Sequence, residues 1–402
     1  MIDFLKICGV FALIIWMLRR QMPLYKAMLV AALTMGLVFG ITPQHIALTA
    51  LTSAVDPSTV ALALTLVLIM FLENIMRRNG MMEGMVRSLK GMVGDSRVVM
   101  AILPALVGLL PSAGGAVFSA PMVEEVSRDT TLSAEKKSFV NYWYRHVWEY
   151  VFPLYPSIIL TAEITGIPIP RLITYMVPYA LSAAVIGIPI AFWHEPRPKR
   201  LESRDGRLRD AAAFMASIYP VLLVIIAVLV LQWEIWISLA GVVVLLLGVF
   251  RYTGARIQAL VREAFSFPII LMVVAVIIFK DVLMLTGAVD TLPAFFASMG
   301  LPVELVVVLL PFVVGLATGM SQAYVGTTFP ILLGLSANGV PVQLVALGYV
   351  SGFLGVMLSP VHLCLILTVQ VFQAQLGKVY RMLLLPSSVQ MALAVVLYFL
   401  LR

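Results

Sequence analysis

The sequence predicts an all-α polytopic membrane protein built as two inverted repeats, each of five transmembrane helices plus one re-entrant helical hairpin. Of its 402 residues, 61% are hydrophobic and only 12% are charged, whereas a soluble domain carries roughly 25% charged residues. Many apolar runs approach the roughly 20 residues that a bilayer-spanning helix needs. Proline, glycine and charged landmarks also recur in the same order in the two halves. Lipid offers no partner for the edge of an open sheet, and the runs are too continuous for alternating barrel strands.

Ten apolar segments have lengths close to one bilayer crossing. The first, Ile2 to Leu18, lacks the basic start and small-residue cleavage site of a signal peptide, so we expect it to be a span. We predict crossings at about 3–18, 24–41, 58–78, 138–160, 170–193, 212–231, 234–250, 265–286, 342–367 and 381–401.

Two further apolar regions do not fit single crossings. One covers about 98–127 and is broken by residues 111–115, and the other covers about 302–335 and is broken by residues 318–322. Each is long enough for two short helices around a polar, glycine-bearing centre, so we predict re-entrant hairpins, with full crossings as the alternative. Non-helical backbone at that depth is tolerated only where protein buries it or a wet cavity hydrates it.

The two halves share landmark residues that lie about 207 positions apart. These landmarks recur in the same order in both halves, which chance similarity between apolar helices would not produce. The pairs are Glu73 with Asp281, Pro104 with Pro311, Gly108 with Gly315, and Pro153 with Pro360. We therefore predict a first repeat over residues 1–193, a basic cytoplasmic linker over 194–211, and a second repeat over 212–402.

Loop charge predicts the orientation of the chain. The loops at about 42–57, 161–169, 232–233, 287–301 and 336–341 contain no Lys or Arg, whereas the loops on the other side and the linker are basic. The positive-inside rule then places the linker in the cytoplasm and both termini outside a cytoplasmic (inner) membrane. Basic loops also account for the net charge of +7 without a nucleic-acid partner.

Inverted repeats with broken helices are typical of transporters that work by alternating access. Free amides at half-helix N-termini bear partial positive charge and can hold an anion, and glycines let the backbone approach it closely. The small residues at the first break could instead serve close packing between helices. The candidate substrate-binding residues are Ser112, Ala113, Gly114 and Gly115 at the first break, and Thr318, Ser321, Gln322, Thr327 and Thr328 at the second.

A second set of residues could bind or couple a cation. Prolines near positions 153 and 360 interrupt two further spans and free backbone carbonyls, intramembrane charges are expensive and hence functional candidates, and histidine titrates near neutrality. A simple kink, a position near the membrane interface, or structural pairing with Arg145 are the alternatives. The candidates are Ser157, Ser359, His146, Glu149, Glu73 and Asp281.

Signals for enzyme or cofactor chemistry are weak. The sequence has no phosphate-binding loop, GxGxxG or HExxH motif. Cys8 and Cys364 lie in apolar segments without metal-ligand spacing. We expect no enzyme activity, no cofactor and no metal beyond Na⁺ as a coupling ion. A membrane-embedded enzyme or a scaffold without transport is the rival from another class, since serine, histidine and acidic residues are all present.

The stretch Leu110 to Val123, LPSAGGAVFSAPMV, resembles the first-hairpin motif of an uncharacterised family in the ion transporter superfamily, and the architecture resembles that superfamily over the full chain. Its members include dicarboxylate and citrate symporters, gluconate permeases and arsenite permeases. The resemblance implies substrate and cation sites at the hairpin tips and the adjoining breaks, a homodimer, and elevator-type movement. The dicarboxylate symporters carry Ser-Asn-Thr at both tips, whereas these tips read Ser-Ala-Gly-Gly and Ser-Gln-Ala-Tyr. We therefore expect a small organic anion, such as a carboxylate, coupled to Na⁺ or H⁺, with inorganic oxyanion export as the alternative.

Overall fold

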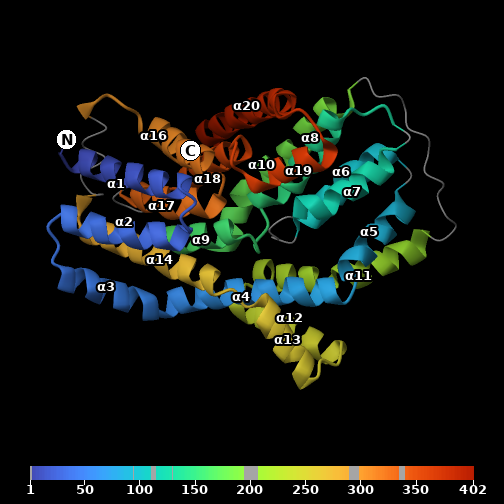
Figure 1. Cartoon of the computed structure of the whole chain (residues 1–402), viewed down its shortest axis with the longest axis horizontal. Coiled ribbons are helices and arrows are strands. Elements are labelled where there is room, and N and C mark those ends of the chain that lie inside the picture. Colours follow the sequence, from blue (N-terminus) through green and yellow to red (C-terminus); the bar gives the residue numbers. More distant parts are fainter. Residues whose placement is uncertain are drawn as a thin grey trace.

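The computed structural model describes residues 2–93, 95–109, 115–128, 130–193, 207–288, 298–334 and 340–402. Every regular element in these ranges is a helix, which confirms the all-α prediction (Figure 1). The elements of the first half are α1 (Ile2–Arg19), α2 (Leu24–Val38), α3 (Pro43–Val55), α4 (Pro57–Arg78), α5 (Met81–Met92), α6 (Ser96–Gly108), α7 (Gly115–Val126), α8 (Ala134–Arg145), η1 (Val147–Tyr150), α9 (Pro156–Thr165) and α10 (Ile169–Phe192). Those of the second half are α11 (Arg207–Leu229), α12 (Ile235–Val249), α13 (Gly254–Ala264), α14 (Phe267–Leu285), α16 (Val303–Thr318), α17 (Ser321–Leu333), α18 (Val342–Met357), α19 (Leu363–Phe372) and α20 (Leu376–Leu401).

Five of the described helices are long and apolar enough to cross a bilayer: α4, α10, α11, α14 and α20. They coincide with five of the predicted crossings. Their outer faces carry large apolar side chains, such as Leu181, which is 63% exposed. A soluble protein would not present such faces to water, whereas lipid covers them at no cost. The chain is therefore a polytopic helical membrane protein.

Three shorter helices lie where the sequence analysis placed loops: α3, α5 and α13. Local signals explain the first, because Thr42 caps it by accepting from the His45 amide, and Pro43 occupies its first turn. The other two carry charged residues and are too short and too polar to cross the bilayer. α11 begins at Arg207, inside the range 194–211 predicted as the linker.

Two predicted crossings, 138–160 and 342–367, are not continuous. The first divides into α8, η1 and α9, and the second into α18 and α19. Each contains a run of five consecutive non-helical residues, 151–155 and 358–362, with a proline in the middle and a new helix directly after it. Proline has no amide donor and its ring clashes with the preceding turn, so each helix stops there. The interruptions expected from Pro153 and Pro360 are thus present.

Two glycines make the same close contact in the two halves. A Cβ on Gly108 would lie 2.0 Å from the carbonyl oxygen of Arg145, and a Cβ on Gly315 would lie 2.2 Å from that of Gly352. Only glycine lets the backbones of α6 and α8, and of α16 and α18, approach so closely. These contacts hold α6 against α8 and α16 against α18. The helices α6 and α16 precede the predicted hairpin breaks, and α8 and α18 precede the proline breaks.

Alanine at either glycine is expected to lower the free energy of unfolding by about 1–3 kcal/mol, because the carbonyl that it meets is backbone and cannot turn aside. Gly241→Ala in α12 is the matched control, since nothing lies within 4 Å of its added methyl group. Thermal unfolding of the purified protein measures the difference. If the Gly108→Ala and Gly315→Ala variants proved as stable as Gly241→Ala, the helices would not be held this closely.

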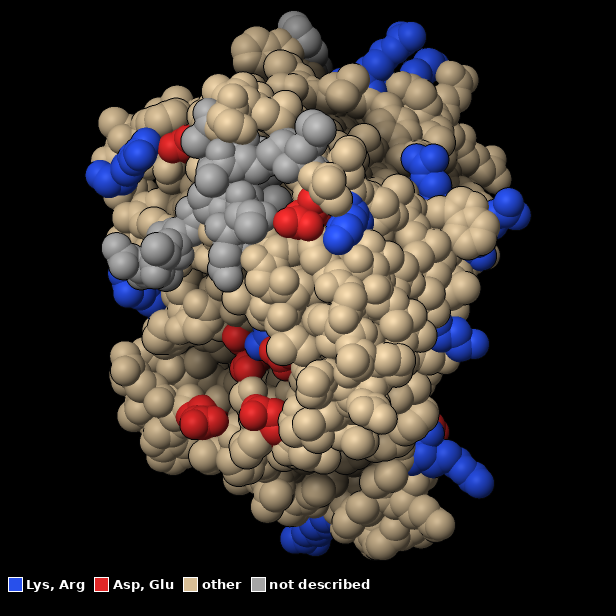
Figure 2. Space-filling view, turned by 90° about the vertical axis from the view of Figure 1, so that its left-hand side faces the viewer, with Lys and Arg blue, Asp and Glu red and all other residues tan. Residues whose placement is uncertain are grey.

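The interior is built around α17 and α18, whose residues are buried on nearly all sides. α17 contacts α9 and α14, and α14 in turn contacts α2, α3 and α4 (Figure 1). The N-terminus lies at the left-hand end in Figure 1, whereas α11 begins at the right-hand end. The left-hand end is hollowed, and acidic side chains gather around the hollow (Figure 2).

Candidate functional site

Three breaks in helices meet at one buried place. They are residues 151–155 between η1 and α9, residues 358–362 between α18 and α19, and Gly319 with Met320 between α16 and α17. His362 Nδ1 donates to the Gly319 carbonyl at 2.9 Å, which joins the second and third breaks. Ser321 Oγ donates to the carboxylate of Glu149, from η1, at 3.2 Å, which joins the third to the first. Side chains from both halves of the chain therefore form this site.

The break between α16 and α17 lies where the sequence predicted the second hairpin tip. Gly319 has a φ of +65°, a left-handed conformation that favours glycine. A Cβ there would lie 2.9 Å from the His362 amide nitrogen and 3.0 Å from Ser359 Oγ. The tip is thus packed directly on the 358–362 break. Thr318 Oγ1 donates back to the Val314 carbonyl within its own helix.

Glu149 is the acidic residue at the centre of this arrangement. The residue is only 8% exposed, and its carboxylate faces the start of α17. The N-cap residue of α17, Met320, makes no side-chain capping hydrogen bond, so the first amides of this helix keep their partial positive charge. The other carboxylate oxygen lies 3.8 Å from His146 Nε2. A carboxylate therefore lies buried beside a hydroxyl and a helix N-terminus, with an imidazole nitrogen 3.8 Å away.

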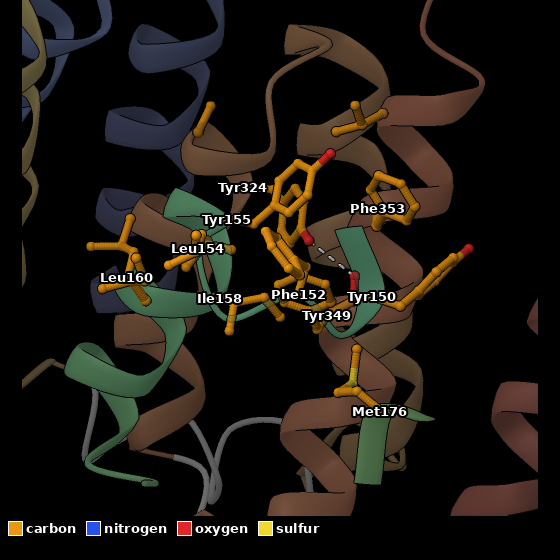
Figure 3. Close-up of a cluster of buried hydrophobic side chains, with 14 of the residues drawn as sticks. Tyr150, Phe152, Leu154, Tyr155, Ile158, Leu160, Met176, Tyr324, Tyr349 and Phe353 are labelled. Atoms are coloured by element: carbon orange, nitrogen blue, oxygen red, sulfur yellow. Dashed lines mark hydrogen bonds between the residues drawn. The ribbon is translucent and has the colours of Figure 1, made fainter. Parts of the chain in front are cut away.

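A layer of tyrosines lies beside Glu149. Tyr349 donates its hydroxyl hydrogen to the Glu149 carbonyl at 2.7 Å, so its oxygen accepts from Ser157 Oγ at 2.8 Å. Tyr324 donates to the Tyr349 carbonyl at 3.1 Å. Figure 3 shows these rings close to Tyr155 and other apolar side chains of the 151–155 break. The layer orders that break, and it engages Ser157, a predicted cation candidate.

Two histidines and their neighbours complete the site. His146, just after α8, and His362, just before α19, bring their Nε2 atoms to 3.2 Å. Arg145 Nη1 donates to Cys364 Sγ at 3.4 Å. Arg145 also interacts electrostatically with Glu149 and with Glu73 of α4. The predicted candidates His146, Glu149 and Glu73 therefore belong to one charged neighbourhood.

A model of the protein family described as "Protein of unknown function (DUF401)" matches residues 7–401. The chain belongs to the DUF401 family. No curated protein matches the sequence. The match runs from α1 to α20, so it covers all three breaks and the residues of the site described above.

The first predicted tip of this DUF401 member falls largely outside the described residues. Ser112, Ala113 and Gly114 lie in the range 110–114, and Gly115 begins α7. Tyr155 Oη donates to the carbonyl of Gly108, near the end of α6, at 2.5 Å. The 151–155 break therefore contacts the helix that leads into the first tip.

Other predicted residues of the DUF401 site have local roles. Thr327 and Thr328 are fully buried within α17, and their hydroxyls donate to the carbonyls of Ala323 and Tyr324 in the same helix. Gln322 lies in the first turn of α17. Ser359 is buried, and its hydroxyl accepts from the Val361 amide at 3.3 Å.

The contacts that Asp281 makes within the described part of the chain do not involve Glu149 or its partners. Its carboxylate accepts from Ser53 Oγ of α3 at 2.6 Å and pairs with Lys280 at 3.2 Å. Its predicted mirror residue, Glu73, instead interacts with Arg145 at the site.

Sequence reasoning missed a buried polar chain beside the site of this DUF401 protein. Ser119 donates to Asn141 Oδ1 at 2.7 Å, and Asn141 Nδ2 donates to Thr368 at 3.1 Å. These residues link α7, α8 and α19. Isolated polar residues within apolar segments are the signal that could have found them, because a buried amide needs partners.

Proposed function

We propose that this chain is a secondary active transporter that moves a small organic anion, such as a carboxylate, across the cytoplasmic membrane, coupled to Na⁺ or H⁺. The observation that carries the proposal is the buried meeting of Glu149, the start of α17 and two proline breaks. Broken helices whose ends face one another deep in a helical membrane protein are the usual construction of substrate and ion sites in secondary transporters.

The anion would bind at the start of α17. In this position Ser321 already donates to a carboxylate, that of Glu149. The N-terminus of α17 adds partial positive charge. An incoming carboxylate has the same chemistry as the group now held there, which supports carboxylates as the substrate class. The predicted tip at Ser112–Gly115 would supply the facing half of the site.

The coupled cation would bind near Glu149. A buried carboxylate is costly unless positive charge compensates it, and a transported anion adds more negative charge to the same place. A co-bound cation offsets both. The acidic hollow at one end of the molecule would raise the local cation concentration on that side (Figure 2).

Alternating access would follow from two inverted repeats over residues 1–193 and 212–402. The proline breaks at equivalent positions and the two matched glycine contacts support this organisation. In this scheme α6 with α7, and α16 with α17, are re-entrant hairpins that move with the neighbouring broken helices as an elevator within a homodimer. The 194–211 linker would be cytoplasmic and both termini outside.

Ligand-dependent thermal unfolding of the purified chain tests the function. Carboxylates of increasing charge and inorganic oxyanions are screened in Na⁺ and in choline, at two pH values. One chemical series should stabilise the protein more strongly with its cation, by about 2.7 kcal/mol at 100 times Kd. The best ligand is then assayed for uptake into proteoliposomes. Absence of both stabilisation and flux would overturn the proposal, and a response to oxyanions alone would indicate an oxyanion exporter.

Ser321→Ala is expected to reduce uptake of the substrate found in this screen at least tenfold. It removes a hydrogen bond to a charged group, and such bonds contribute about 1.5–3 kcal/mol. Initial uptake rates over a range of cation concentrations measure the effect. Ser238→Ala in α12 is the matched control, because its hydroxyl donates only to the Glu234 carbonyl in a neighbouring turn. Equal uptake by the two variants would remove Ser321 from the site.

A further inference from the structure

The tautomers of His146 and His362 are fixed by their surroundings. His146 Nδ1 lies 2.6 Å from the Tyr142 carbonyl oxygen, and His362 Nδ1 lies 2.9 Å from the Gly319 carbonyl oxygen. A carbonyl oxygen only accepts hydrogen bonds, so each Nδ1 carries its hydrogen. In a neutral imidazole the other nitrogen is then a bare acceptor.

Two acceptors therefore face each other, since the Nε2 atoms are 3.2 Å apart. Ring stacking does not explain the approach, because the ring planes cross at 67°. Both rings are buried, so bulk water does not separate the lone pairs. The pair is stable only if an electron-pair acceptor lies between or beside the two nitrogens.

We propose that His146, His362 and Cys364 bind a divalent transition-metal ion of the Zn²⁺ class. Two imidazole ligands of one tetrahedral zinc ion, each about 2.0–2.1 Å from the metal, lie about 3.3 Å apart, close to the separation seen here. Cys364 supplies a sulfur, and the three donor atoms all lie within 4.8 Å of one another. Nitrogen and sulfur donors together favour zinc and similar ions over Na⁺ or Mg²⁺.

The surroundings of the three donors fit a metal site. Ligating histidines usually donate their second N–H to a carbonyl or a carboxylate, as both do here. Glu149, with an oxygen 3.8 Å from His146 Nε2, offsets the positive charge that Arg145 brings close to Cys364.

An ion at this site would tie the end of α8 to the start of α19. It would also stabilise the contact between His362 and Gly319, and so hold the tip between α16 and α17 on the 358–362 break. The sequence analysis expected no metal beyond Na⁺, because Cys8 and Cys364 show no ligand spacing. His146 lies more than 200 positions from His362 and Cys364, so the sequence did not connect the three. The inference does not depend on transport.

Metal titration of the full-length protein tests it. Purified protein is stripped with a chelator, kept reduced, and titrated with Zn²⁺ by calorimetry and with Co²⁺ by absorption spectroscopy. The wild-type protein should bind one equivalent, and a sulfur-to-cobalt charge-transfer band should appear. His146→Gln and His362→Gln should each weaken binding at least 100-fold, because loss of even a second-sphere partner weakens metal binding about 10–100-fold. Cys364→Ser should remove the charge-transfer band.

His45→Gln is the control, since this histidine is exposed on α3 and should leave binding unchanged. Unfolding temperatures without metal show whether each variant is folded. No binding by the wild-type protein would overturn the proposal and leave a shared proton as the electron-pair acceptor. Unchanged binding in the His146→Gln, His362→Gln double variant would place the metal elsewhere. Neither result requires a transport substrate, so this test can fail while the proposed function stands.

Discussion

Glu149→Gln is expected to abolish cation-coupled uptake, with a loss of at least about 100-fold, while the protein stays folded. The amide keeps the size of the side chain and can still accept from Ser321, but it has no charge to attract a cation. Buried charges are costly in a membrane protein and are retained for function. The unfolding temperature should therefore stay the same or rise. Uptake into proteoliposomes with and without a cation gradient measures the loss.

Glu135→Gln is the matched control for this substitution. Glu135 lies in the first turn of α8 and pairs with Lys378 at 3.9 Å, at the edge of the molecule. Such a surface pair contributes little, so uptake and its dependence on the cation gradient should stay near the wild-type values. Coupled uptake at the wild-type rate by Glu149→Gln would show that this carboxylate does not hold the cation.

The long helices could be predicted because hydropathy alone determines them. A run such as residues 58–78 has no alternative in lipid but to form all of its hydrogen bonds within one helix, and α4 follows it closely. α5 and α13 could not be found in the same way, because each is short and carries charged residues at intervals. Their stability comes from packing on α11 and α4, which the sequence does not display.

The breaks were predictable from backbone chemistry. Gly319, Pro153 and Pro360 lie in the breaks and favour them. Proline alone does not decide, because Pro104 and Pro311 lie inside continuous helices. Thr327 and Thr328 suggested a ligand site, yet their own helix satisfies both hydroxyls.

The contacts across the site could not be predicted. Glu149 and His146 are near neighbours in sequence, so their grouping was expected. Their partners Ser321 and His362 lie far along the chain. The packing of α17 and α18 against the first half brings these residues together. The sequence alone does not show how these helices pack. The histidine pair and its neighbour Cys364 were missed for this reason.

Gly319→Ala is expected to disrupt the site through the backbone. A left-handed alanine costs about 1–2 kcal/mol, and the new methyl group would lie 2.9 Å from the His362 amide nitrogen. That neighbour is main chain and must shift, which adds about 1–3 kcal/mol. The shift displaces the His362 side chain from the Gly319 carbonyl. We expect both a lower unfolding temperature and a loss of uptake of at least about tenfold.

Gly166→Ala separates the two contributions. Gly166 ends α9 with a φ of +68°, and nothing lies within 4 Å of its added Cβ. It therefore carries the same backbone cost, about 1–2 kcal/mol, without a contact at the site. The excess destabilisation of Gly319→Ala over Gly166→Ala then measures the packing of the α16–α17 tip on the 358–362 break. If the two variants unfold at the same temperature and transport equally well, the tip is not held against that break, and the buried meeting of helix ends on which the transport mechanism depends does not exist in the working protein.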